Sequence, residues 1–178
     1  MKHLKNINEY FSNINEGVNY NNSVNADLVE IGEYAIQGSG KNPGDVTDED
    51  LEKAAVEALK KAKPVSLTGD AKKDIPALVK YAVDAFKRCQ IELDPANVEI
   101  DSSNFANELM IPVADSEYYF NTHLDYTELA SNGSDFVIGG NFASDEDGAL
   151  DYIVDDLSNQ GDIVKACAEF KKYLESQG

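Results

Sequence analysis

Residues 108–124 read ELMIPVADSEYYFNTHL, and this stretch decides the fold class. Apolar and aromatic side chains cluster at Glu108–Val113 and again at Tyr118–Leu124, with an acidic break between the two clusters. Short clusters of this kind, bounded by turn residues, are typical of β-strands. An antiparallel meander is the simplest topology for strands that follow each other so closely, so we expect one here.

The same reading extends the meander on both sides of these two strands. We expect a strand at Val98–Ser102 and another at Phe136–Gly140. Asn132-Gly133 is a hairpin turn signal between the segments Tyr126–Ala130 and Phe136–Ile138.

Helical spacing of apolar residues flanks this central region. The clearest helix begins after Thr47, because Thr47 and Asp50 resemble a capping box, and it ends before Pro64. We expect further helices over residues 3–15, 26–37, 75–89, 146–157 and 162–175. The order predicts an α+β fold with N-terminal helices, a central antiparallel strand meander and two C-terminal helices.

The first part of the chain suggests an appendage to a single domain. Residues 1–17 form an amphipathic leader or docking helix in this interpretation, and residues 18–25 form an Asn-rich linker. The remaining residues, 26–178, are then one α+β domain. Hydrophobic residues make up 42% of the 178, which is enough for a real core.

Negative charge is concentrated in the second half of the chain. The formal net charge is −18, and the stretch between Arg88 and Lys165 carries 17 acidic residues without a single Lys or Arg. Such a composition disfavours direct nucleic-acid binding, which needs cations to replace phosphate counterions, and it also disfavours an anionic membrane surface. It favours a basic protein partner, or serves solubility alone. The candidate interaction residues are Asp115, Glu117, Asp125, Glu128, Asp135, Asp145, Glu146 and Asp147.

The two cysteines, Cys89 and Cys167, lie among apolar residues in expected helices. Their spacing fits neither a metal site nor a disulfide framework, so we interpret them as buried free thiols. We find no secretory segment and no apolar run long enough to span a membrane, so we expect synthesis in the cytoplasm.

Tests for catalytic and metal-binding motifs give little. His123 and Asp125 share a strand face by alternation, but a second histidine is missing nearby. Asp145-Glu146-Asp147-Gly148 fails the EF-hand register, because Ala143 and Val154 would stand at the first and last ligand positions. These acids fit the first turn of a helix, where the dipole favours them. We therefore predict no catalytic residue, no metal site and no cofactor, with a loose divalent site as the weakest alternative.

A short N-terminal motif offers a lead. Ile14-Asn15-Glu16-Gly17 follows the expected amphipathic helix, and the combination resembles the N-terminal leaders of head proteins in large contractile-tailed phages. The resemblance implies capsid targeting and cleavage by a prohead protease after Glu16, before the small residue Gly17. It covers only about the first seventeen residues. Ile7-Asn8-Glu9 has the same core, but bulky Tyr10 follows it.

Three functions therefore stay open. The first is a non-enzymatic structural or interaction protein, including a virion or internal head protein that binds other virion proteins. The second is an acidic DNA-mimic-like inhibitor that binds a basic site on a nucleic-acid or defence enzyme. The third is a divalent-metal-binding protein that uses His123, Asp125 and nearby carboxylates.

Overall fold

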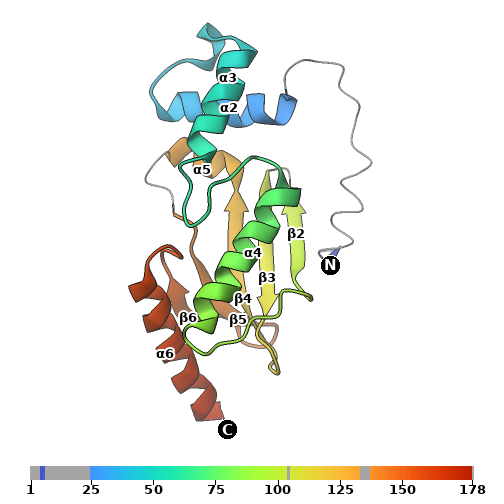
Figure 1. The fold of residues 1–178 in the computed structure, drawn as a ribbon, viewed down its shortest axis with the longest axis vertical. Helices are drawn as coiled ribbons and strands as arrows, with labels where there is room; N and C mark the ends of the chain where they lie inside the picture. Colours follow the sequence, from blue (N-terminus) through green and yellow to red (C-terminus); the bar gives the residue numbers. More distant parts are fainter. Residues whose placement is uncertain (1–4, 7–24, 104, 133–136, 178) are drawn as a thin grey trace.

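The computed structural model describes residues 5–6, 25–103, 105–132 and 137–177 and shows an α+β fold, as predicted (Figure 1). The described helices are α2 (Ala26–Gly38), α3 (Asp48–Leu59), α4 (Ala71–Lys87), α5 (Tyr126–Asn132) and α6 (Gln160–Gln177), with a short 3-10 turn at Pro43–Asp45. The described strands are β1 (Lys5–Asn6), β2 (Glu99–Ser103), β3 (Ala106–Pro112), β4 (Tyr118–Asp125), β5 (Gly140–Ser144) and β6 (Gly148–Val154).

The strands form one sheet in the order β1-β2-β3-β4-β5-β6, and every neighbouring pair is antiparallel. The predicted meander is therefore confirmed. Burial alternates strictly along β3 and through most of β4, as expected for strands with one face on the core.

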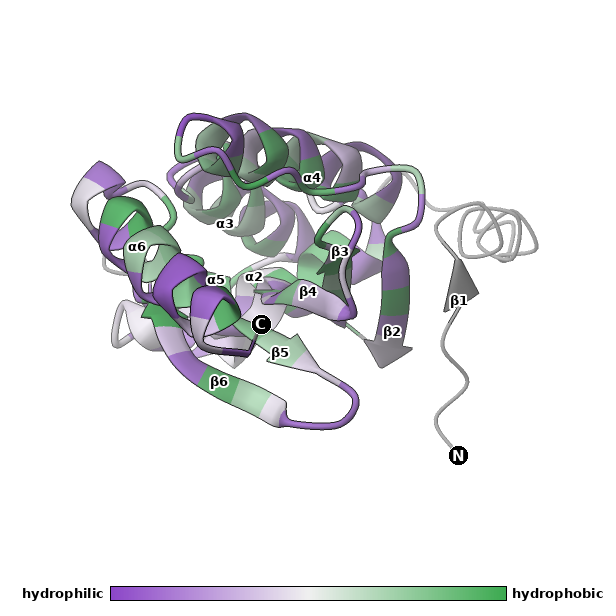
Figure 2. Ribbon diagram, turned by 90° about the horizontal axis from the view of Figure 1, so that it is seen from below, coloured by the Kyte–Doolittle hydropathy of each residue, from purple (hydrophilic) through white to green (hydrophobic). Residues whose placement is uncertain are grey.

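Helices α4 and α6 lie on the same side of the sheet (Figure 2). An aromatic cluster joins them to it. Phe86 of α4 packs on Phe120 at 4.7 Å between ring centroids, and Phe170 of α6 stacks on Phe142 at 4.0 Å. All four rings are fully buried. The opposite side of the sheet, which we call the outer face, carries no helix among the described residues (Figure 2).

Helices α2, α3 and α5 gather at one end of the sheet (Figure 1). Two glycines of α2 allow close contact there. A Cβ atom at Gly32 would meet the Leu51 carbonyl of α3, and one at Gly38 would meet the Ser131 carbonyl of α5. The glycines therefore set how closely this helical end packs.

Several predicted elements are confirmed with small shifts. Helix α2 matches its expected range, and α3 begins at the predicted Thr47 capping box with Asp50. Helix α4 begins earlier than expected, because the Asp70 side chain accepts a hydrogen bond from the Lys72 amide and caps it. Strands β2, β3 and β4 differ from the expected ranges by a residue or two.

The expected helix over 146–157 is wrong, so the described chain has one C-terminal helix instead of two. Residues 148–154 form β6, in which Leu150, Tyr152 and Val154 alternate toward the helices. That period of two competes with the three- and four-residue spacing of Ile153, Val154 and Leu157. The acids 145–147 are therefore a hairpin turn and not the start of a helix.

The hairpin arm expected at Tyr126–Ala130 is also wrong. These residues form α5, because Asp125 accepts hydrogen bonds from the amides of Thr127 and Glu128 and caps the helix. The expected Asn132-Gly133 hairpin is therefore wrong too, since α5 runs to Asn132. The strand expected at Phe136–Gly140 is displaced, because β5 begins only at Gly140 and runs to Ser144, while Phe136 lies outside the described residues.

The N-terminal prediction fails where the structure tests it. Lys5 and Asn6 lie within the expected helix 3–15, but they form a strand opposite Ile100 and Glu99 of β2. Pairing with the edge of a sheet satisfies backbone groups that β2 would otherwise leave open, and this outweighs a weak helical pattern. The rest of the leader, including Ile14, Glu16 and Gly17, and most of the 18–25 linker lie outside the described residues.

Candidate acidic interaction surface

Three chain segments meet at the end of the sheet opposite the helical end. They are the β3–β4 turn, the β5–β6 turn and the segment that leads into β2 (Figure 1). Tyr118 pairs with Ser144, so the two turns are neighbours. The leading segment lies against the β3–β4 turn, because the Ala114 amide donates to the Glu92 carbonyl at 2.8 Å.

This end carries a dense set of carboxylates, and residues 89–98, 113–117 and 145–147 contain no Lys or Arg. We call it the acidic end and define it by Glu92, Asp94, Asp115, Glu117, Asp145, Glu146 and Asp147. Five of these were predicted from the sequence, and the structure brings them together. Glu92 and Asp94 were missed, since only the Leu93–Val113 bridge places them there.

The β3–β4 turn holds its two acids outward. The Val113 amide donates to the Tyr118 carbonyl at 2.8 Å, and the Ser116 hydroxyl donates to the Val113 carbonyl at 3.0 Å. Asp115 takes a left-handed backbone with φ of 56°, a conformation that Asp and Asn tolerate better than most residues. Asp115 and Glu117 are both exposed as a result.

The β5–β6 turn is closed by the buried Ser144, whose hydroxyl accepts from the Asp147 amide at 3.0 Å. Asp147 also accepts a hydrogen bond from the Tyr173 hydroxyl of α6 at 2.9 Å. Hydrogen bonds with Tyr118 and then with Asp147 raise the pKa of Tyr173. Asp147 is therefore tied to α6, while Asp145 and Glu146 stay exposed.

Local hydrogen bonds keep Asp94 charged. Its carboxylate accepts from the Asn97 side-chain amide at 2.6 Å and from the Ala96 backbone amide at 2.9 Å. These bonds favour the ionised form and lower the pKa of Asp94 below its usual value.

The outer face of the sheet continues the negative charge away from the acidic end. Alternation directs Glu99 and Asp101 of β2, Glu108 of β3 and Asp151 of β6 to this face. None of them was singled out from the sequence. The available signal was strand alternation around the buried Ile100 and Leu109, which assigns their neighbours to the opposite side.

The pKa of Tyr119, on the outer face of β4, is affected by this negative charge. Partial burial raises its pKa, and the charges of Asp145, Glu108 and Glu99 raise it further. Carboxylates from the acidic end and from two strands thus act on one hydroxyl. The negative charge of the acidic end therefore extends toward Glu99 and Glu108 on the outer face.

Three predicted interaction residues lie elsewhere. Asp125 caps α5, and Glu128 lies in the first turn of that helix, at the opposite end of the sheet from the acidic end. Asp135 lies outside the described residues. The eight predicted acids are therefore not one surface, because α5 reverses the chain where a hairpin was expected.

The structure does not place His123, Asp125 and nearby carboxylates as a metal-binding site. His123 is exposed on β4 and pairs with Glu108 of β3, while the Asp125 carboxylate accepts from the Thr127 hydroxyl and two backbone amides. Within the part of the chain that the structure describes, no group of three His, Cys, Asp or Glu side chains is placed to hold a metal ion.

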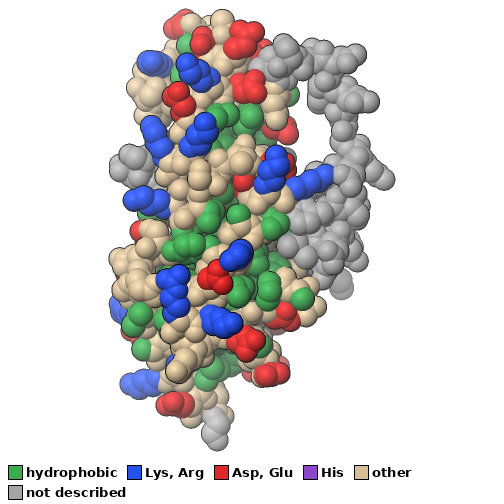
Figure 3. Space-filling model, in the orientation of Figure 1, with side chains coloured by type: hydrophobic (Ala, Val, Ile, Leu, Met, Phe, Trp, Pro, Cys, Tyr) green, Lys and Arg blue, Asp and Glu red, His purple; other side chains and the backbone are tan. Residues whose placement is uncertain are grey.

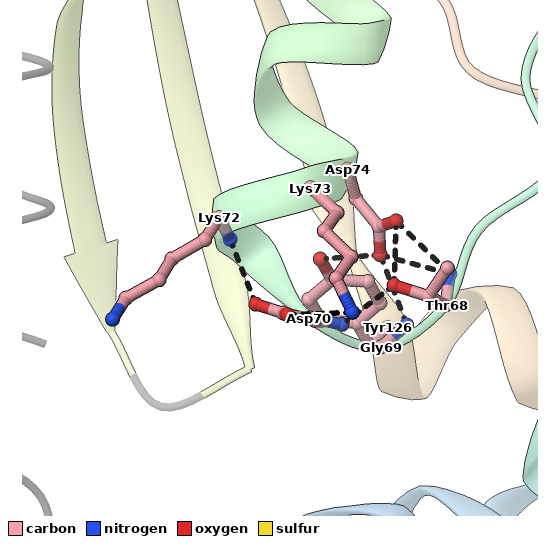
Figure 4. A network of polar contacts seen from close by, with 7 residues as sticks. All are labelled: Thr68, Gly69, Asp70, Lys72, Lys73, Asp74 and Tyr126. Atoms are coloured by element: carbon pink, nitrogen blue, oxygen red, sulfur yellow. Dashed lines mark hydrogen bonds and ion pairs between the residues drawn. The ribbon is translucent and has the colours of Figure 1, made fainter.

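A second polar feature lies at the start of α4 (Figure 4). Asp74 is only 2% exposed, yet its carboxylate accepts from the Thr68 amide, the Thr68 hydroxyl, the Gly69 amide and the Tyr126 hydroxyl, all at 2.9–3.0 Å. It joins the loop before α4 to α5. A depression of about 790 Å³ opens beside it, lined by Asp70, Lys73 and other residues. Because donors already surround the Asp74 carboxylate, we assign this network to stability.

Comparisons with protein-family models, with curated proteins and with solved structures give no significant match. None of the helices that the structure describes is both long and apolar enough to cross a membrane.

Proposed function

We propose that this protein is a non-catalytic binding protein that docks onto a basic surface of a partner protein. The observation that carries the proposal is the gathering of seven carboxylates at the acidic end from residues 89–98, 113–117 and 145–147, which contain no Lys or Arg. The outer face extends the same charge over the sheet. Carboxylates at this density attract a cationic surface and speed its association.

The sidedness of the charge supports an oriented contact. Every Lys and Arg between Lys41 and Lys172 falls in the helical segments and their connections, before Cys89 or after Asn159. Figure 3 shows such side chains interspersed with Asp and Glu on the face that carries α4. A basic partner would thus be attracted by the acidic end and partly repelled by the helix face.

A charge-matched pair of variants tests this function. The first variant replaces three exposed acids of the acidic end: Asp115→Asn, Glu117→Gln and Glu146→Gln. The control replaces three exposed acids of the helical end: Glu30→Gln, Glu33→Gln and Glu57→Gln. Both sets change the net charge equally, and none of the six side chains makes a hydrogen bond described above.

The probe is a synthetic Lys- and Arg-rich peptide, with binding measured by titration at low and at physiological salt. We expect the acidic-end variant to bind roughly tenfold more weakly at low salt and to lose much of its salt dependence. The control should retain most of the wild-type affinity. Equal weakening of both variants would mean that only net charge matters, and absence of wild-type binding would contradict the proposal outright.

A nucleic-acid-binding site is one form that this basic surface could take, because Glu99, Asp101 and Glu108 lie together on the adjacent strands β2 and β3 of the outer face. Partners captured from host lysate on the immobilised protein would be released by double-stranded DNA if they use such a site. If DNA does not release the captured partners, the protein is not a DNA mimic, and the proposed contact with a basic protein surface is unaffected by that result.

The proposed setting is a tailed-phage virion, supported by the Ile14-Asn15-Glu16-Gly17 motif. Co-expression with a prohead protease followed by mass spectrometry should give a new N-terminus at Gly17. An uncleaved chain would contradict the proposed virion setting. The binding function would still be decided by the peptide titration.

A further inference from the structure

The two cysteines of the protein meet where α4 ends against α6. Residues on either side of Cys89 contact α6: the Arg88 guanidinium donates to the Gln160 side chain at 3.1 Å, and Lys171 donates to Gln90 at 3.3 Å. Cys167 lies between these two contact points on α6. The fold thus brings together thiols that are far apart in the sequence.

The Cys89 side chain also lies near enough to Cys167 to act on its thiol. Cys167 is 2% exposed, and its burial, followed by the nearby Cys89, raises its pKa. Cys89 is only half-buried, so it is the thiol that a reagent in solution reaches first.

The backbone around Cys89 is held in place. The turn that follows α4 contains a left-handed residue, Gln90, at φ of 59°. The Gln90 amide donates to the Lys87 carbonyl at 3.0 Å, and the Ile91 amide donates to the Phe86 carbonyl at 3.1 Å. These two bonds make a Schellman-type end to the helix, which fixes the backbone of Cys89 in the turn between α4 and the segment that leads into β2.

We propose that Cys89 and Cys167 are a redox modification site that forms a reversible disulfide with a small-molecule disulfide as oxidant. The Cys89 thiolate attacks one sulfur of the oxidant, and a mixed disulfide forms as the first small thiol leaves. The Cys167 sulfur, after losing its proton, attacks the Cys89 sulfur and releases the second small thiol. The protein loses two protons and two electrons, and the oxidant gains both as it becomes two thiols.

The disulfide would close a loop of chain that contains every strand from β2 to β6, because Cys89 precedes β2 and Cys167 follows β6. A cross-link over so long a loop restricts the unfolded chain strongly, whereas the folded chain already holds the two thiols together. The oxidised protein should therefore resist heat better than the reduced one. Helix α6, the last described element, could no longer separate from α4.

The test incubates the full chain, at low protein concentration, with excess oxidised glutathione and follows its mass and thiol content. The wild type should lose both free thiols and two hydrogens in mass, retain no glutathione and remain monomeric on a non-reducing gel. Its melting temperature should rise by about 5 °C or more and return to the starting value after reduction.

Two variants make the outcome decisive. Cys167→Ala should keep glutathione on Cys89, because the second attack is lost, and Cys89→Ser should react slowly, since Cys167 is buried. A wild type that retains glutathione on Cys89, keeps two free thiols at equilibrium or links into dimers would overturn the proposal. The mass readout on the wild type does not depend on how well either variant folds.

Discussion

The Tyr126 hydroxyl donates a hydrogen bond of 3.0 Å to the buried carboxylate of Asp74. The bond links the first residue of α5 to the first turns of α4, so it joins the helical end to the helix that covers the sheet. The remaining donors to Asp74 come from the loop that precedes α4.

Tyr126→Phe should lower the free energy of unfolding by about 1–2 kcal/mol, because a buried charged acceptor loses one donor. Tyr34→Phe is the matched control, since Tyr34 is 39% exposed, and it should change stability by less than about 0.5 kcal/mol. Urea denaturation measures both. Equal effects would mean that the Asp74 network does not depend on Tyr126.

Gly32→Ala should be strongly destabilising. A Cβ atom at Gly32 would overlap the Leu51 carbonyl, which is backbone and cannot swing away, so α2 and α3 must separate. We expect a loss of about 2 kcal/mol or more by urea denaturation. Gly44→Ala is the control, because its nearest neighbour is the Asn42 side chain at 3.5 Å. A Gly32→Ala protein as stable as this control would contradict the close packing of the two helices.

Asp125→Ala separates the structural acids from the binding acids. Asp125 caps α5 through the Thr127 and Glu128 amides, so its loss should cost about 1 kcal/mol of stability. It lies away from the acidic end, so the affinity for the basic peptide should stay near the wild-type value. A large drop in affinity for the basic peptide with unchanged stability would mean that Asp125 belongs to the binding surface and would contradict this prediction.

Asp145→Asn should lower the pKa of Tyr119. The negative charge of Asp145 disfavours the tyrosinate, so removing that charge makes the hydroxyl easier to ionise. Added salt should act in the same direction by screening Glu108 and Glu99. Titration by NMR of the labelled tyrosine rings measures the change, and Glu33→Gln, at the helical end, should leave it unaltered.

The fold class and the centre of the sheet could be predicted from the sequence because β3 and β4 carry their own alternation and the acidic break between them. The Thr47 cap could be predicted because its signal is also local in the sequence: its partner Asp50 is only three residues away. The failures at 126–130 and 146–157 have another cause. Short segments there carry both periods, and tertiary contacts with α2 or α6 decide between them.

The candidate surface was partly predictable. Acid abundance identified Asp115, Glu117 and the 145–147 turn, but α5 moved Asp125 and Glu128 to the other end of the molecule. The meeting of Cys89 with Cys167 has no local signal at all, because it depends on how α6 returns across the end of α4. Such long-range pairings require the topology before they can be seen.

The nearest-neighbour order of the strands has a consequence for how the chain folds. Each strand from β3 to β6 bonds to the one before it, so the part of the sheet from β2 to β6 can be built by successive short loop closures, and only α5 lengthens one of them. Sheets of low contact order fold faster than those that must pair distant segments. The slow events should therefore be the docking of α4 and α6, because their aromatic contacts, Phe86 on Phe120 and Phe142 on Phe170, require a sheet that already exists.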